Sequence, residues 1–207
     1  MRIFKKHINQ HSIVCCSGGV DSICVAHYLQ KKFNVHELYH FNHGTPQADA
    51  FQQTVERFAH DFKFNLTIRH ANHSLASEAE CRDARFEYIR SQTDKTFITG
   101  HNLDEASESY LLNCFNGVVE YIPIPVISEF GSNKVIHPFL MIDKEMFRKY
   151  SIINGLDQYV VEDLSNFDSS SGRRAWIRNA LMPQLKEKNI GIKKIVLKKY
   201  LKIYEKQ

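Results

Sequence analysis

Short apolar runs alternate with helix-period segments over the first 115 residues, and this alternation limits the fold more than any other feature of the sequence. Apolar and β-branched residues predict strands at 12–16, 35–41, 64–69 and 96–99. Helices are predicted between them, at 20–33, 47–61, 74–91 and 103–115. Because strands joined by crossover helices run parallel, we predict an α/β fold with a doubly wound, mainly parallel sheet.

The second half of the sequence reads differently. Residues 116–138 contain Pro123, Pro125, Gly131 and Pro138, and they predict an irregular loop. Helices are expected at 143–153 and 172–185. We therefore divide the chain into an α/β domain at 1–140 and a helical C-terminal part at 141–207.

Composition limits the class of protein. No apolar run reaches membrane-spanning length, so we expect a soluble, cytoplasmic protein without a membrane partner. Five cysteines form no CxxC pair and give no disulfide framework or zinc spacing. The net charge is +4, but residues 186–207 hold eight lysines against two glutamates, so positive charge is concentrated in the tail.

The first predicted strand runs directly into a helix through Ser-Gly-Gly, within the stretch VCCSGGVDSIC at 14–24. Such a junction directs backbone N–H groups and the positive end of a helix dipole at one point, which is typical of an anion site. Asp21 would repel a phosphate unless Mg²⁺ lay between them, which indicates a metal-bound pyrophosphate. A tight turn with Asp21 as a partner of the helix dipole is the alternative. The residues of this predicted anion site are Ser17, Gly18, Gly19, Val20, Asp21 and Ser22.

Polar residues also follow the other predicted strands, where ligands of doubly wound sheets bind. Four residues at these strand ends are candidates for the same ligand site: His43, Gly100, His101 and Asn102. The pairs His40/His43 and His70/His73 lack the third ligand of a zinc site, and Cys15 and Cys16 suit a buried strand better than a catalytic thiol.

The loop SGGVDS at 17–22 resembles the pyrophosphate loop of the N-type ATP pyrophosphatases, or PP-loop enzymes. Three further stretches resemble tRNA(Ile)-lysidine synthetases: HFNHG at 40–44, ECRDARF at 80–86 and TGHNLDEASES at 99–109. EDLSN at 162–166, RAWIR at 174–178 and PQL at 183–185 are similar to the DxSN and RNxIRxxxxPxL segments of the same family. The similar stretches follow the family's order from Val14 to Leu185.

The resemblance implies an ATP- and Mg²⁺-dependent ligase that modifies tRNA. Its ATP would be bound by the loop residues 17–22 and by His43, Gly100, His101 and Asn102. ATP would adenylate the C2 carbonyl of the wobble cytidine in a tRNA(Ile) with a CAU anticodon, and lysine would then form lysidine, releasing pyrophosphate and AMP. Asp21 would contact the metal, and Arg82, Arg85, Arg174 and Arg178 would face the α-phosphate and the departing AMP. Three acidic residues would hold the amine of lysine or take its proton: Asp104, Glu105 and Glu108.

The sequence departs from the family at two places. It has DEASES at 104–109 where the family has DDQAET, so that Glu105 is one methylene longer, on the order of 1 Å. It has Arg174-Ala175 where the family has Arg-Asn. The chain also ends about where the family's catalytic domain ends, which makes a homodimer one alternative for completing the RNA-binding surface.

The tail at 192–204 predicts a basic amphipathic helix packed on the body. Its packed face is predicted to hold Ile192, Ile195, Val196, Lys199, Tyr200 and Ile203. With Arg174 and Arg178, the lysines Lys193, Lys194 and Lys198 are the predicted contacts to tRNA phosphates, and a merely solubilising face is the alternative.

Two other functions stay open. Another PP-loop enzyme, such as a tRNA thiolase, is disfavoured by the absence of CxxC or of a three-cysteine cluster. A catalytically weakened relative that binds tRNA or nucleotide would account for the altered DDQAET stretch.

Overall fold

The computed structural model describes residues 2–45, 47–71, 78–118, 122–161 and 172–206, and within α3 (Glu78–Ser91) the side chains of 78, 79, 81 and 82 are also outside the description. Six strands form one sheet in the order β3-β2-β1-β4-β6-β5. They are β1 (Ile13–Cys15), β2 (Glu37–Asn42), β3 (Asn65–His70), β4 (Thr96–Ile98), β5 (Ile127–Phe130) and β6 (Asn133–Ile136). All neighbours pair in parallel except β5 and β6, and Val14 lies opposite Leu38 on one side and Ile98 on the other.

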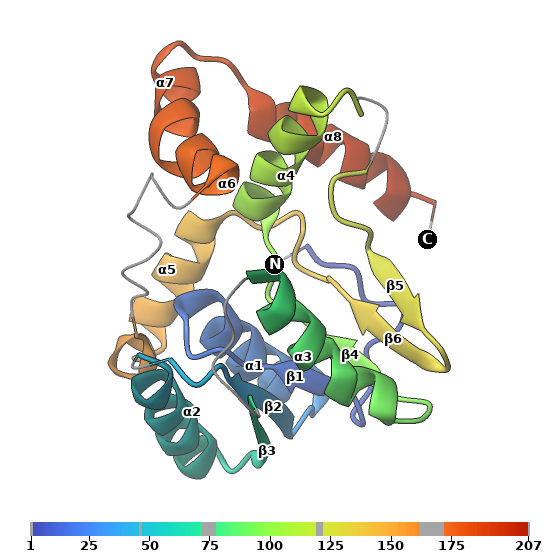
Figure 1. Ribbon diagram of the computed structural model, residues 1–207, viewed down its shortest axis with the longest axis vertical. Coiled ribbons are helices and arrows are strands. Elements are labelled where there is room, and N and C mark those ends of the chain that lie inside the picture. The colour runs from blue at the N-terminus through green and yellow to red at the C-terminus, as the bar shows by residue number, and fades with distance from the viewer. Residues whose placement is uncertain (1, 46, 72–77, 119–121, 162–171, 207) are drawn as a thin grey trace.

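Helices cover both faces of the sheet, which confirms the predicted α/β architecture. One face packs on α1 (Val20–Phe33), α2 (Ala48–Phe62) and α5 (Lys144–Ile153), whose apolar side chains share a buried cluster with the strands. The other face packs on α3 through Ile89, which is buried with Phe97 and Val135. Figure 1 shows the sheet between α1 behind it and α3 in front.

The prediction of an irregular loop over residues 116–138 was wrong, because β5 and β6 form a hairpin there. Strand β6 is short and begins with two polar residues, but its Val135 and Ile136 are buried beside Phe97 and Ile98 of β4. The buried amide of Asn133 donates to the carbonyls of Ile89 and Gln92 and accepts from the N–H of Lys95. Contacts distant in sequence therefore stabilise this strand more than its own residues do.

The helical C-terminal part forms largely as predicted. Residues 173–187 run as α6 (Arg173–Trp176), a π-helical turn η3 (Ile177–Leu181) and α7 (Met182–Glu187). The tail is α8 (Ile192–Tyr204), and it packs against α4 (Leu103–Phe115). The division at residue 140 stays a prediction.

The tail helix docks through a face slightly different from the predicted one. Val196 and Tyr200 are buried, and the hydroxyl of Tyr200 donates to the carbonyl of Ile124 at 2.8 Å. Ile195 was predicted to face the body, but it is 45% exposed. The helix rotates toward Leu197 and Leu201, because these side chains pack in the same cluster as Tyr200.

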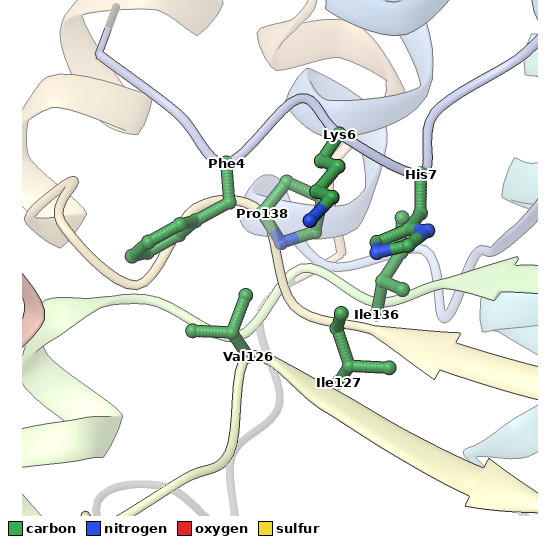
Figure 2. A pocket seen from close by; sticks show the side chains of 7 residues that line it. All are labelled: Phe4, Lys6, His7, Val126, Ile127, Ile136 and Pro138. Carbon is green, nitrogen blue, oxygen red and sulfur yellow. The ribbon is translucent and has the colours of Figure 1, made fainter. Parts of the chain in front are cut away.

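A small cavity lies where the N-terminal segment crosses the start of β5 and the end of β6 (Figure 2). Phe4 anchors this segment, since its N–H donates to the carbonyl of Pro138 at 3.0 Å. The cavity has a volume of about 10 Å³, which is room for about one water molecule, so it holds no nucleotide. Within the described residues, no helix is both long and apolar enough to span a bilayer.

Candidate active site

The loop between β1 and α1 has a shape that requires glycine. Gly18 has a φ of +89°, and a Cβ at this position would lie 3.1 Å from the ring of Phe51 and 3.2 Å from its carbonyl oxygen. Gly19 begins α1 without a side-chain cap. The first N–H groups of the helix therefore lack a side-chain cap, and the anion site at this turn stays a prediction.

Ser22 holds this loop together from inside. Its buried hydroxyl donates to the carbonyl of Gly19 at 3.0 Å and accepts from the N–H of Ser17 at 3.1 Å. Ser17 is exposed, and its own hydroxyl lies 3.2 Å from that of Ser22. Of the two serines predicted to contact phosphate, Ser17 is exposed and Ser22 shapes the loop.

Asp21 has two oxygens in different surroundings. Oδ2 accepts from Nδ2 of Asn102 at 3.0 Å, whereas Oδ1 is buried and has no hydrogen-bond partner among the described residues. Burial raises the pKa of Asp21 to about 7; Glu105 and Asp104 also raise it, and Lys144 opposes the shift. A lone buried carboxylate oxygen fits a hard cation such as Mg²⁺. The described residues contain no group of three His, Cys, Asp or Glu that could hold a metal, so phosphate oxygens would have to supply other ligands.

Two helix N-termini meet at this edge because β4 lies beside β1. A Cβ on Gly100 would be 3.3 Å from the N–H nitrogen of Ser22, so the end of β4 touches the first turn of α1. Asn102 then caps α4 reciprocally with Glu105: its Oδ1 accepts from the Glu105 N–H and its own N–H donates to Glu105 Oε2. One amide side chain therefore joins α4 to Asp21.

A histidine that the sequence analysis did not select lies at the same edge. His137 follows β6, and its Nδ1 is 3.0 Å from Nδ1 of His101. The Thr99 hydroxyl is within hydrogen-bonding distance of both rings. The apolar residues Val135 and Ile136 are followed by His137 and Pro138, and this pattern could have indicated the end of a strand. It lies in the segment that was predicted as a loop.

His43 lies at the end of β2, and its ring contacts that of Phe41. Burial, with Arg85 and His40 nearby, lowers the pKa of His43, and burial lowers that of His40, whose Nδ1 donates to the Cys16 carbonyl at 2.8 Å. Both rings are therefore neutral near pH 7. His73 is outside the described residues.

The cysteine thiols of the first strand are unsuited to nucleophilic attack. Burial raises the pKa of Cys15 to about 12 and that of Cys16 to about 11, so both remain protonated at neutral pH.

Two of the three predicted amine-binding carboxylates, Asp104 and Glu108, pair with cations of the chain itself. Oδ2 of Asp104 accepts from the Lys144 N–H at 2.8 Å, and Oδ1 pairs with Lys193 Nζ at 2.5 Å. Glu108 is 4% exposed and receives both Nε and Nη2 of Arg178 at 2.9 Å. Arg174 adds a longer contact of 3.4 Å to Oε2. Lys193, Arg174 and Arg178, predicted to contact RNA, therefore contact carboxylates here.

Glu105 interacts electrostatically both with Asp21 and with the arginines Arg174 and Arg178. Burial raises its pKa, although Arg174, the Asn102 N–H, Arg178 and Lys144 oppose the shift. A carboxylate with a raised pKa is better matched to proton transfer near neutral pH than an exposed one.

Other predicted site residues are more distant or outside the description. Arg85 lies on α3, and its charge helps to lower the pKa of His43. The side chain of Arg82 is not among those described. Lys194 and Lys198 are exposed on α8. The EDLSN stretch at 162–166 is outside the described residues.

This geometry agrees with a comparison of the sequence with protein families. A PP-loop domain matches residues 1–185. The chain belongs to the PP-loop domain family. The glycine loop at 17–22 is called the PP-loop below.

The PP-loop domain is also similar to curated tRNA(Ile)-lysidine synthases. That of Legionella pneumophila (strain Lens) is 28% identical over 190 residues, which cover 87% of this chain and 43% of the relative. That of Streptococcus mutans is 27% identical over 206 residues, covering 91% and 44%. The chain thus spans less than half the length of these relatives.

Two solved structures share the fold of this PP-loop domain. A U34-tRNA thiolase from Methanococcus maripaludis has a TM-score of 0.72 at 17% identity and covers 99% of this chain and 75% of that one. An NH3-dependent NAD synthetase from Campylobacter jejuni has a TM-score of 0.52 at 13% identity, covering 94% and 87%. At these identities the likeness concerns the fold alone.

Proposed function

We propose that this protein uses ATP to adenylate the wobble cytidine of a tRNA(Ile) with a CAU anticodon and then joins lysine to it, in the cytoplasm. The proposal rests on one observation above the others: Asp21 presents a buried, unpartnered oxygen at the N-terminus of α1, beside the glycine loop. The similarity to tRNA(Ile)-lysidine synthases supports the choice of RNA and amine.

Activation comes first, because C2 of cytidine carries no group that an amine can expel. The C2 carbonyl oxygen attacks the α-phosphorus of ATP, the bond from that phosphorus to the β-bridging oxygen breaks, and pyrophosphate leaves. Gly18, Gly19 and the first turn of α1 would bind the pyrophosphate. Bound at Asp21, Mg²⁺ would supply neutralisation of phosphate charge.

Amine attack follows. The ε-amino nitrogen of lysine bonds to C2, the bond from C2 to the adenylated oxygen breaks, and AMP leaves. The lysine ammonium must lose a proton, since its ordinary pKa is near 10. Glu105 is the carboxylate best suited to accept it, because its pKa is raised and its side chain lies near Asp21.

Glu108 would bind the ammonium only after an exchange of partners. Its carboxylate is occupied by Arg178 and Arg174, whose guanidinium groups match phosphate as well as carboxylate. A phosphate drawn to these arginines would leave Glu108 available to the amine. We therefore propose that tRNA and ATP bind before lysine.

The test is RNA-dependent release of pyrophosphate, followed by mass spectrometry of the nucleosides. Protein, ATP, Mg²⁺, lysine and a CAU tRNA(Ile) should give a cytidine heavier by lysine minus water. The same tRNA with a CAC anticodon loop, which retains the wobble cytidine, tests selection by the rest of the anticodon. Pyrophosphate release without a lysine adduct would refute lysine as the amine.

A catalytically weakened binding relative is the second candidate. It is favoured by the engagement of Asp104 with Lys193 and of Glu108 with Arg178, which leaves neither carboxylate open. Tight tRNA binding with no pyrophosphate release from any RNA would establish this candidate in place of the enzyme.

A further inference from the structure

An aromatic pair lies exposed beside the arginines of α6. Phe115 at the end of α4 is 56% exposed, Trp176 at the end of α6 is 46% exposed, and their ring centroids are 6.2 Å apart. Large aromatic side chains are normally covered in a folded protein, so an exposed neighbouring pair indicates a contact surface. Figure 1 shows α6 beside α4, which brings the two helix ends together.

Positive charge borders this pair. Arg173 lies three residues before Trp176, is exposed, and its Nη1 donates to Asn116 Oδ1 at 3.5 Å. Arg174 and Arg178 follow on the same helical segment, where the π-turn begins directly after Trp176. Aromatic faces combined with arginines are how proteins hold single-stranded nucleic acid: bases stack on the rings and guanidinium groups meet phosphates.

From this geometry we infer that Phe115, Trp176 and Arg173 form a stacking surface for unpaired RNA bases. We call these three residues the aromatic surface. The inference rests on the proposed function. It adds the place where the protein binds the RNA substrate beyond the reacting base. Leu103 and Phe115 are the two ends of α4, about 18 Å apart at 1.5 Å per helical residue. The aromatic surface therefore receives neighbours of the target base, while that base reaches the PP-loop edge.

Three other occupants fit this surface less well than unpaired RNA. A second copy of the chain, or a further domain of a longer protein, would cover the apolar rings but gain nothing from Arg173. Double-stranded RNA would meet the arginines, but its stacked bases would offer no face to the rings. The combination of uncovered rings and an exposed guanidinium favours unpaired bases.

The chain contains a built-in probe, because Trp176 is its single tryptophan. Titration with a short single-stranded RNA should quench the tryptophan emission in a saturable way, without ATP. A duplex of the same composition should leave most of the emission unchanged. An emission change that depends on protein concentration without RNA would indicate a second copy and overturn the inference.

Variants separate stacking from charge. With labelled single-stranded RNA followed by anisotropy, Phe115→Ala and Trp176→Ala should each weaken binding about 5-fold to 100-fold, and Trp176→Phe should retain most of it. Ile153→Ala is the matched control, since Ile153 is 81% exposed on α5, and it should bind as the parent does. Unchanged affinity in both alanine variants would overturn the inference.

Failure of this inference is distinguishable from failure of the proposed function. If Trp176→Ala binds RNA normally while pyrophosphate release persists, the function stands and the aromatic surface does not. If RNA quenches Trp176 but no pyrophosphate is released, the aromatic surface stands and the ligase does not.

Discussion

In the protein without a bound cation, Asp21 lowers the free energy of unfolding at neutral pH. Because its pKa is raised to about 7 from an ordinary value near 4, the folded state holds a proton that the unfolded state has released. The folded state therefore loses stability as the pH rises from about 4 to about 7. Such a cost is offset only when a cation occupies the position beside Oδ1.

Replacing Asp21 should separate stability from activity. Asp21→Asn keeps an acceptor for Asn102 but has no charge, so it should unfold at higher urea than the parent at pH 8. The gain in unfolding free energy of Asp21→Asn over the parent should be larger at pH 8 than at pH 5, by an amount on the order of 2 kcal/mol. Urea denaturation without ATP, at both values of pH, measures it.

The same variant should release pyrophosphate more than 100-fold slower, since metal neutralisation of phosphate is worth several kcal/mol. Asp157→Asn, at an exposed position, is the control and should behave as the parent in both assays. An active Asp21→Asn would contradict the metal role.

Gly18 offers a test of the loop itself. Gly18→Ala should both destabilise the fold and weaken ATP binding, because its φ is positive and its Cβ would press on Phe51. Gly117→Ala has a similar φ of +78° but nothing within 4 Å, so it should show only the backbone cost, about 1 kcal/mol. Equal effects on ATP binding, measured by calorimetry, would show that contact with Phe51 is unimportant.

At the scale of elements, one carboxylate joins α4 to the segment from α6 to α7. Glu108→Gln removes the charge that holds Arg178 and Arg174, and it should lower the unfolding free energy by about 1–3 kcal/mol. Glu145→Gln is the matched control, since Glu145 pairs with Lys149 on the surface at 3.8 Å and is worth about 0.5 kcal/mol or less. Chemical denaturation measures both.

The helices could be predicted from sequence because their signals are local. Asn102 and Asp143 each accept a hydrogen bond from an N–H of the first turn, and apolar positions repeat with the helical period. The hairpin of β5 and β6 escaped prediction because its polar Asn133 is satisfied by residues about 40 positions earlier.

The candidate site likewise combines local features, which the sequence predicts, with contacts between distant residues, which it does not. The strand-to-helix turn at the PP-loop could be predicted because its hydrogen bonds are local: Ser22 donates to the carbonyl of Gly19, three residues earlier. The sequence could not specify which acids meet which bases: Glu108 is 70 residues from Arg178, and Asp104 is 89 residues from Lys193. Such pairs depend on how α6 and α8 pack on α4.

For the whole molecule, the uneven charge predicts how RNA binding responds to salt. Lys194→Gln and Lys198→Gln should each lower the slope of log K against log salt by about 0.7 to 0.9, if each contacts one phosphate. Lys149→Gln, whose lysine is exposed on α5, should leave the slope unchanged. Unchanged slopes in the α8 variants would identify these lysines as a solubilising face.

Asn102 and Asp21 would fare differently in a lineage that no longer needed the reaction. Asn102 would persist, because α4 begins on its side chain whether or not anything is catalysed. Asp21 would be replaced by a neutral residue, because its buried charge destabilises a protein that binds no cation. The proposed function would therefore account for a buried charge that the fold by itself does not require.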